Sequence, residues 1–335
     1  MTGWSGDGAP GDGSLRNFAV GAVRQHFTKT LNRNILGDDS FDPLLPTDAV
    51  LPTSAELDAL EAFQLSTGRP VDMDLAGLVL KDADASTGQA LFVNGTGNPL
   101  AGGKCNACHM NAGALSTFDG QNNNFDTGVE VSEATIALRE QYGIGALPFD
   151  GGFGLVPNSG GFGDGSFNTP PLVEAADTLP LFHNNSAETL EAAIAFFNSD
   201  AFNAPRLPAA RIQLTDLQVS QIAAFLRVIN TLENIRSATT FLTDAKSAST
   251  SKITERRIKQ AREDIKDGIG VLSEQGLHPF AKQKLKEARK LATEAHKAKS
   301  TSKTNALIKQ AIGALQSARA DLCDAAESDD DVFCP

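Results

Sequence analysis

Several residue types are scarce in this chain of 335 residues. It contains only four cysteines, three methionines, one tryptophan and one tyrosine. No run of about twenty apolar residues occurs, so no membrane-spanning helix is expected. The basic part of the chain has only two aromatic residues, Phe241 and Phe280. Its composition therefore does not point to nucleic-acid binding.

Charge divides the chain into parts. The formal net charge is −12, but it is unevenly spread. Residues 1–236 carry 12 Lys and Arg against 27 Asp and Glu, whereas residues 237–322 carry 17 against 9. Such asymmetry predicts separate modules. An acidic module would attract a basic partner by electrostatic steering, although a solvated acidic surface beside a basic helical bundle fits the same counts.

The most specific motif is C-x-x-C-H, formed by Cys105, Cys108 and His109. This spacing is the attachment signature of a c-type haem. Two thiols three positions apart can each form a thioether to one haem vinyl group, and the histidine that follows can ligate the iron. The motif therefore predicts one covalent haem c on Cys105 and Cys108, with His109 as the proximal ligand of its iron.

A zinc half-site and a redox dithiol are the alternatives to haem attachment. Zinc needs a second pair of ligands, but Cys323 and Cys334 are eleven positions apart with no histidine near them. A thioredoxin-type dithiol belongs in a βαβ pattern, which is not visible here. Cys323 and Cys334 are expected to pair as a disulfide in an oxidising compartment, with two free thiols as the alternative.

Hydrophobic periodicity predicts an all-α chain. Thr53 and Glu56 form a capping box, which opens a helix that ends near residue 68. Further helices are expected over residues 15–32, 85–92, 190–197 and 215–232. Three more helices beyond residue 237 predict a helical bundle.

Three domains follow from these patterns. Residues 1–50 form an N-terminal segment and connector, residues 51–236 a cytochrome c-type haem domain with long loops, and residues 237–335 a helical bundle with an acidic tail. The two histidines of the bundle, His278 and His296, are expected to be solvated surface residues.

Several segments resemble the bacterial di-haem cytochrome c peroxidase superfamily, which includes the methylamine-utilisation di-haem maturase. Its pattern F-x-T-P-x-L, T-x-P-x-x-H-[DN] and T-L-E after the second haem motif is similar to residues 167–172, 178–184 and 189–191. Residues 214–232 resemble the helix that closes the same domain. Residues 3–8 resemble the W-D-G segment that closes the first haem domain, with Trp4 as its aromatic residue.

This resemblance implies a mostly helical cytochrome c fold in which two haems cooperate, one taking up electrons and the other reducing hydrogen peroxide to water. The single C-x-x-C-H of this chain corresponds to the second, electron-accepting domain. The first domain is represented only by a remnant within residues 1–50, so either it has been removed or the chain is a single-haem offshoot. Trp4 matches the family's electron relay between the haems, with a packing anchor as the alternative.

The resemblance also implies two further sites. Thr178 and Pro180 match positions whose backbone carbonyls help to hold a calcium ion between the domains. His26 falls near the family's acidic peroxidatic residue, and a histidine there could act as an acid–base group for O–O cleavage. A buried, hydrogen-bonded helix histidine is the alternative for His26.

The sixth ligand of the iron is an open question in the sequence. The family's electron-transfer haem takes a methionine fourteen residues after the histidine that matches His183, or a tyrosine in the maturase. Phe197 stands there in this chain and cannot ligate iron. The loss of a sulfur ligand removes one means of raising the haem potential. Three outcomes stay open: a five-coordinate iron with Phe197 over an open site, His183 as a second axial histidine, or a ligand from elsewhere, His26 or Tyr142.

These features predict a periplasmic or otherwise exported c-type cytochrome, because covalent haem is normally installed after export. No signal peptide is visible at the N-terminus, which favours a mature form or a fragment. The expected function is electron transfer from a small redox protein to a second haem, in an N-terminal domain or a second subunit, or to hydrogen peroxide as a peroxidase-type oxidoreductase. The alternatives are a non-catalytic electron-transfer or gas-binding domain, and a structural assembly subunit that uses its bundle for contacts.

Overall fold

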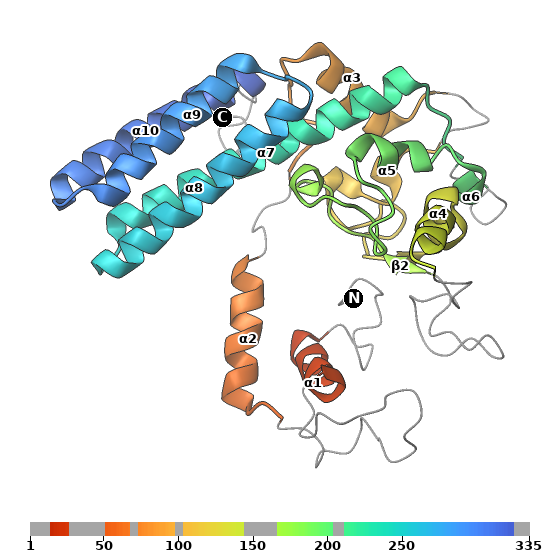
Figure 1. Cartoon of the computed structure of the whole chain (residues 1–335), viewed down its shortest axis with the longest axis horizontal. Coiled ribbons are helices and arrows are strands. Elements are labelled where there is room, and N and C mark those ends of the chain that lie inside the picture. The colour runs from red at the N-terminus through yellow and green to blue at the C-terminus, as the bar shows by residue number, and fades with distance from the viewer. Residues whose placement is uncertain are drawn as a thin grey trace.

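The computed structural model describes residues 14–26, 51–67, 73–97, 103–143, 166–203 and 211–324. These residues are mostly helical, which confirms the all-α prediction (Figure 1). The helices are α1 (Leu15–His26), α2 (Ser54–Thr67), α3 (Ala83–Asn94), α4 (Glu133–Gln141), α5 (Leu190–Phe196), α6 (Asp200–Asn203), α7 (Asp216–Ser247), α8 (Ser251–Glu274), α9 (Pro279–Lys297) and α10 (Thr301–Leu322). Two short antiparallel strands, β1 (Asn124–Phe125) and β2 (Phe167–Asn168), pair with each other.

Capping side chains explain where several helices begin. The hydroxyl of Thr53 accepts a hydrogen bond from the Glu56 N–H, and the Glu56 carboxylate accepts one from the Thr53 N–H at 2.8 Å. The capping box predicted before α2 is therefore confirmed. A second capping box, formed by Thr215 and Gln218, opens α7.

The crossing of α3 and α7 organises the part of the molecule that carries the C-x-x-C-H motif. Phe92 on α3 packs against Phe225 on α7, with ring centroids 5.3 Å apart, and both side chains are fully buried. Gly88 lets the two helices approach closely, because a Cβ at that position would overlap the carbonyl oxygen of Gln221. The motif follows α3 along the chain, so this crossing sets where the motif lies.

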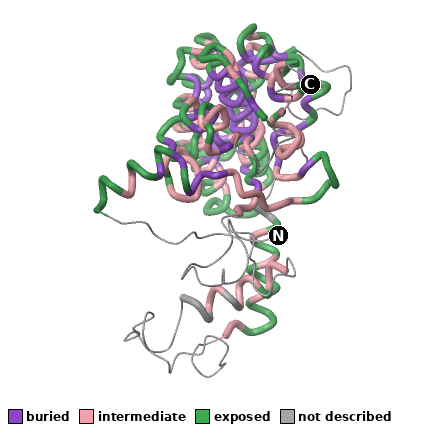
Figure 2. Tube along the Cα trace, turned by 90° about the vertical axis from the view of Figure 1, so that its right-hand side faces the viewer, coloured by how far each residue is buried: buried purple, intermediate pink, exposed green. Residues whose placement is uncertain are grey.

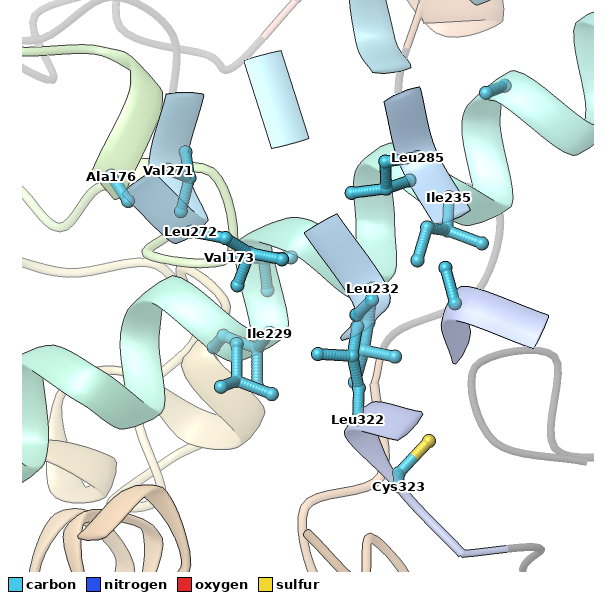
Figure 3. Packing of buried hydrophobic residues seen from close by; sticks show 14 of the residues in the cluster. Val173, Ala176, Ile229, Leu232, Ile235, Val271, Leu272, Leu285, Leu322 and Cys323 are labelled. Carbon is cyan, nitrogen blue, oxygen red and sulfur yellow. The ribbon is translucent and has the colours of Figure 1, made fainter. Parts of the chain in front are cut away.

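Helix α7 belongs to both halves of the described structure. It runs without a break through the boundary expected at residues 236 and 237, and its second half packs with α8 and α10 (Figure 1). Helix α9 in turn packs against α8 and α10. Figure 3 shows side chains of one continuous cluster from both halves: Val173, Ala176, Ile229, Leu232, Ile235, Val271, Leu272, Leu285 and Leu322. The predicted helical bundle is present, and it shares its core with the first half.

The end of α10 is tied to the segment before α3. The Lys81 N–H donates to the Leu322 carbonyl and the Asp324 N–H donates to the Val79 carbonyl, each at 3.0 Å. The Lys81 ammonium adds an ion pair with Asp324 at 3.1 Å. Cys323 is disulfide-bonded, whereas Cys334, its expected partner, lies outside the described residues. These contacts hold the bundle against the first half of the chain.

Residues near the N-terminus are described only in part. Helices α1 and α2 contact each other and lie apart from the other helices, where Figure 2 shows mainly exposed and intermediate residues. The helix expected over residues 15–32 is described as α1 up to His26, and residues 27–50 lie outside the described part.

One prediction for the bundle is wrong. His278 is not a solvated surface residue, because its side chain is only 8 % exposed and its Nδ1 lies 3.4 Å from a carboxylate oxygen of Asp321. It precedes Pro279 in the break between α8 and α9, and the end of α10 covers it. His296 is exposed, as predicted.

Candidate functional site

The C-x-x-C-H motif forms a single helical turn. The N–H groups of Cys108 and His109 both donate to the Cys105 carbonyl, at 3.2 and 2.9 Å. In such a turn, residues three and four positions apart lie on the same side. Cys105, Cys108 and His109 are therefore presented together. Both thiols are free, and Cys105 packs against the hydrophobic core.

A long-range hydrogen bond fixes the imidazole of His109. Its Nδ1 lies 2.9 Å from the carbonyl oxygen of Pro170, sixty-one positions further along the chain. A carbonyl oxygen can only accept, so Nδ1 carries the hydrogen in this contact. Nε2 is then the ring nitrogen with a lone pair for a metal. Histidine ligands are commonly oriented in this way by a carbonyl behind the ring.

Two loops hold Pro170 in place beside His109. The Leu172 N–H donates to the Ala112 carbonyl at 2.7 Å. The side-chain amide of Asn122 donates to the Ala114 and Thr169 carbonyls, at 2.7 and 2.9 Å. Pro170 is thus flanked on both sides by bonds between its own segment and the loop that follows the motif.

Burial controls the ionisation of the motif residues. It raises the pKa of Cys105 to about 12 and also raises the pKa of Cys108. It lowers the pKa of His109 to about 4, against the opposing effect of the hydrogen bonds with Pro170 and Gly113. At neutral pH the site therefore presents two thiols and one neutral imidazole.

These ionisation states disfavour the two alternatives to haem attachment. A redox dithiol works through a cysteine with a lowered pKa, whereas both cysteines here have raised values. A zinc site needs thiolates and further ligands. The described residues contain no group of three His, Cys, Asp or Glu placed to hold a metal ion. Two free thiols and a neutral imidazole at this spacing are donors of the kind that haem c attachment uses.

His183 lies in a separate polar cluster. Its Nε2 contacts the buried carboxylate of Glu130, which also pairs with Arg139 at 2.7 Å. Its ring stacks on Phe167 with centroids 3.7 Å apart and an interplanar angle of 11°. Phe167 belongs to β2, which leads directly to Pro170. Because Glu130 engages Nε2 of His183, this geometry disfavours His183 as a ligand of an iron bound at the motif.

The remaining predicted site residues occupy varied places. Phe197 follows the last residue of α5 as its C-cap and lies in a cluster of aromatic rings, 5.3 Å from Phe196 and 4.9 Å from Phe202 between centroids. Tyr142 is 67 % exposed at the end of α4, which disfavours a ligand role in a buried site. His26 is the last residue of α1, but its side chain lies outside the described part, as does all of Trp4.

The calcium site predicted from the resemblance lies in an exposed segment. Thr178 and Pro180 are both exposed. The Thr178 hydroxyl donates to the Glu174 and Ala175 carbonyls at 3.2 and 3.4 Å, so it turns back on its own segment. The backbone carbonyls of Thr178 and Pro180 stay the predicted ligands.

Sequence reasoning missed three residues of this region. The sequence marks Pro170 only as part of the family pattern, and it carries no signal for Asn122 or for Glu130 as the partner of His183. Nothing in the local sequence around Pro170 indicates that its carbonyl oxygen accepts a hydrogen bond from the distant His109. The contact arises from pairing of β1 with β2, which joins segments more than forty positions apart.

Comparisons of the chain with models of known protein families, with curated proteins and with solved structures found no match. Among the described residues, no helix is both long enough and apolar enough to cross a membrane.

Proposed function

We propose that this chain is an exported c-type cytochrome that transfers electrons through one covalent haem. Cys105 and Cys108 carry the two thioether bonds, and His109 is the proximal ligand through Nε2. A small redox protein is the proposed electron donor, attracted by the acidic first part of the chain.

The hydrogen bond between His109 Nδ1 and the Pro170 carbonyl carries this proposal. It selects the tautomer that ligates iron through Nε2, and it does so next to two free thiols at the attachment spacing. The close crossing of α3 and α7 adds support, because it joins the helix before the motif to a helix that follows the motif in the chain.

Haem c, when bound, supplies an iron that cycles between two oxidation states. Cys105, Cys108 and His109 would hold it, and the groups around His109 would orient the imidazole. The Pro170 carbonyl holds the imidazole at a fixed rotation. By accepting the Nδ1 hydrogen it raises the electron density of the ring, which makes Nε2 a stronger metal ligand. Asn122 and the Leu172 N–H keep the segment of that carbonyl in place, so the imidazole would move little if the charge of a bound iron changed.

Absorption spectroscopy of protein matured in a haem-installing host tests this assignment. The wild-type protein should show the bands of a thioether-linked haem, and His109→Ala should shift them, because the proximal imidazole is lost. Added imidazole should largely reverse the shift. His296→Ala is the matched control and should leave the spectrum unchanged, since His296 is exposed on the bundle. A His109→Ala spectrum identical to the wild type would contradict the assignment.

A second candidate function is the binding of a small molecule at an open sixth position, with reduction of hydrogen peroxide as the reaction it would permit. The observation that favours it is the engagement of His183 Nε2 by Glu130, together with phenylalanine at position 197. Carbon monoxide should then bind the ferrous protein readily, and Phe197→Met should convert the iron to a six-coordinate state. If the spectrum of Phe197→Met equals that of the wild type, Phe197 does not face the iron. Rapid peroxide-dependent oxidation of a reduced cytochrome would separate a peroxidase from a gas-binding domain.

A further inference from the structure

A basic groove runs between α8 and α9 on the outside of the bundle. Its volume is about 480 Å³. The lining includes the cationic side chains of Lys286, Arg289, Lys290 and Lys297, with a single carboxylate, Glu294, among them and Ile269 as an apolar wall.

Within the part of the chain that the structure describes, the lysines of this groove have no acidic partner. Lys286, Lys290 and Lys297 take part in no ion pair with any other described residue, whereas Lys266 and Lys284 elsewhere on the bundle pair with neighbouring acids. The pKa of Asp267 is raised, mainly by burial, and the positive charge of Arg289 opposes that shift. Lys290 and Lys297 are two helical turns apart, about 10 Å along one face of α9.

Helix α4 presents the complementary surface. Glu133 and Glu140 are exposed, are also seven positions apart, and pair with no basic group in the described ranges. Ile136 lies between them on the same side and is 46 % exposed. Arg139, the one basic residue of α4, is turned away and bonded to Glu130 at 2.7 Å. The outer face of α4 is therefore acidic with an apolar centre.

These two surfaces cannot meet within one molecule. Figure 1 shows α4 in the part of the molecule opposite to the end of the bundle where α8 and α9 extend. The first 236 residues carry a net negative charge and residues 237–322 a net positive charge, so long-range attraction favours the approach of one copy's acidic part to another copy's bundle.

We propose that α4 of one copy docks in the α8–α9 groove of a second copy, so that copies of this chain associate head to tail. Glu133 and Glu140 pair with Lys290 and Lys297 at matching two-turn spacing, and Ile136 meets Ile269. Laying an amphipathic helix face in a groove is a common mode of recognition. Because the two surfaces differ, the contact is heterologous and generates rings or open chains rather than a symmetric dimer.

Sedimentation velocity on the full-length protein tests this association with two sets of charge reversals. The groove variant is Lys286→Glu/Lys290→Glu/Lys297→Glu and the α4 variant is Glu133→Lys/Glu140→Lys. The control is Lys252→Glu/Lys303→Glu/Lys309→Glu, which reverses three exposed lysines of the same bundle outside the groove. Wild type and control should self-associate at low salt, and raising the salt to roughly 0.5 M should weaken the association.

Each reversed variant alone should bind itself at least about tenfold more weakly than the wild type. An equimolar mixture of the two variants should associate again, because each reversed surface then finds an oppositely charged one. A wild type that stays monomeric at low salt overturns the proposal, as does association that persists in both variants. Loss in both variants without recovery on mixing overturns α4 as the occupant of the groove.

Discussion

Asp264 on α8 shows how burial and neighbouring charges act together on one carboxyl group. Burial raises its pKa to about 6, a hydrogen bond from Ser237 opposes the shift, and the charges of Asp267, Glu174 and Glu233 add to it. Its Oδ2 is buried and has no hydrogen-bond partner among the described residues. The ionised form is therefore costly at neutral pH.

Asp264→Asn should stabilise the protein at pH 7. The pKa in the folded state lies above the unfolded value, so the folded state binds more protons between about pH 4 and pH 6. Stability due to this group is consequently lost as the pH rises through that window. We expect the substitution to raise the free energy of unfolding by about 1–2 kcal/mol at pH 7 and by nearly nothing at pH 4.

Urea unfolding at several pH values measures this difference. Glu255→Gln, an exposed carboxylate on the same helix, is the control and should show no such trend. An Asp264→Asn gain that stays constant down to pH 4 would argue against desolvation as the cause.

At the scale of elements, the contact between α3 and α7 depends on the absence of a side chain at one position. Gly88→Ala should destabilise the protein by about 3 kcal/mol, because its Cβ would overlap the backbone of α7 at Gln221 and push the helices apart. Gly270→Ala is the matched control, since a Cβ there meets no atom within 4 Å. It should stabilise α8 by about 0.5–1 kcal/mol.

Thermal unfolding of the two glycine variants gives both values. A neutral Gly88→Ala would mean that α3 and α7 have room between them.

The helices were predictable from local patterns, but the extent of α7 was not. The Thr53 box and the inward spacing on α8, α9 and α10 are local signals, and the structure confirms them. The hydrophobic spacing predicts a helix over residues 215–232, and the change in charge near residue 237 predicts a module boundary, but α7 continues to Ser247. Charge resides on solvent-exposed side chains, whereas Ile235, Ala238 and Leu242 continue the buried face without a break. A change in surface charge along the chain therefore does not mark the end of a helix.

The candidate site also has features that local sequence predicts and features that only the fold shows. Cys105, Cys108 and His109 lie within five positions, and their spacing alone predicts haem attachment. The Pro170 carbonyl reaches His109, and the Glu130 carboxylate reaches His183, through contacts between segments far apart in the sequence. No periodicity encodes such contacts. Local motifs predict the donors, and only the fold shows what orients them.

At the scale of the whole molecule, the shared core makes the two halves depend on each other. Leu242→Ala lies in the bundle half of α7 at a fully buried position. It should destabilise the protein by about 2–5 kcal/mol, and the loss should appear equally in helix content and in haem absorbance. Leu217→Ala, 63 % exposed on the same helix, is the control and should change little.

Circular dichroism and haem absorbance, followed during one thermal scan, make this comparison. A haem transition that keeps its wild-type midpoint while the helical signal shifts would show that the halves unfold separately.

The central claim is that the C-x-x-C-H turn carries a covalent haem. Intact mass spectrometry of the exported protein, before and after treatment with a thiol-alkylating reagent, tests it most directly. We predict the polypeptide mass plus one haem, with Cys105 and Cys108 protected from alkylation, and loss of both features in Cys105→Ser/Cys108→Ser. A bare polypeptide mass with both thiols alkylated would contradict it.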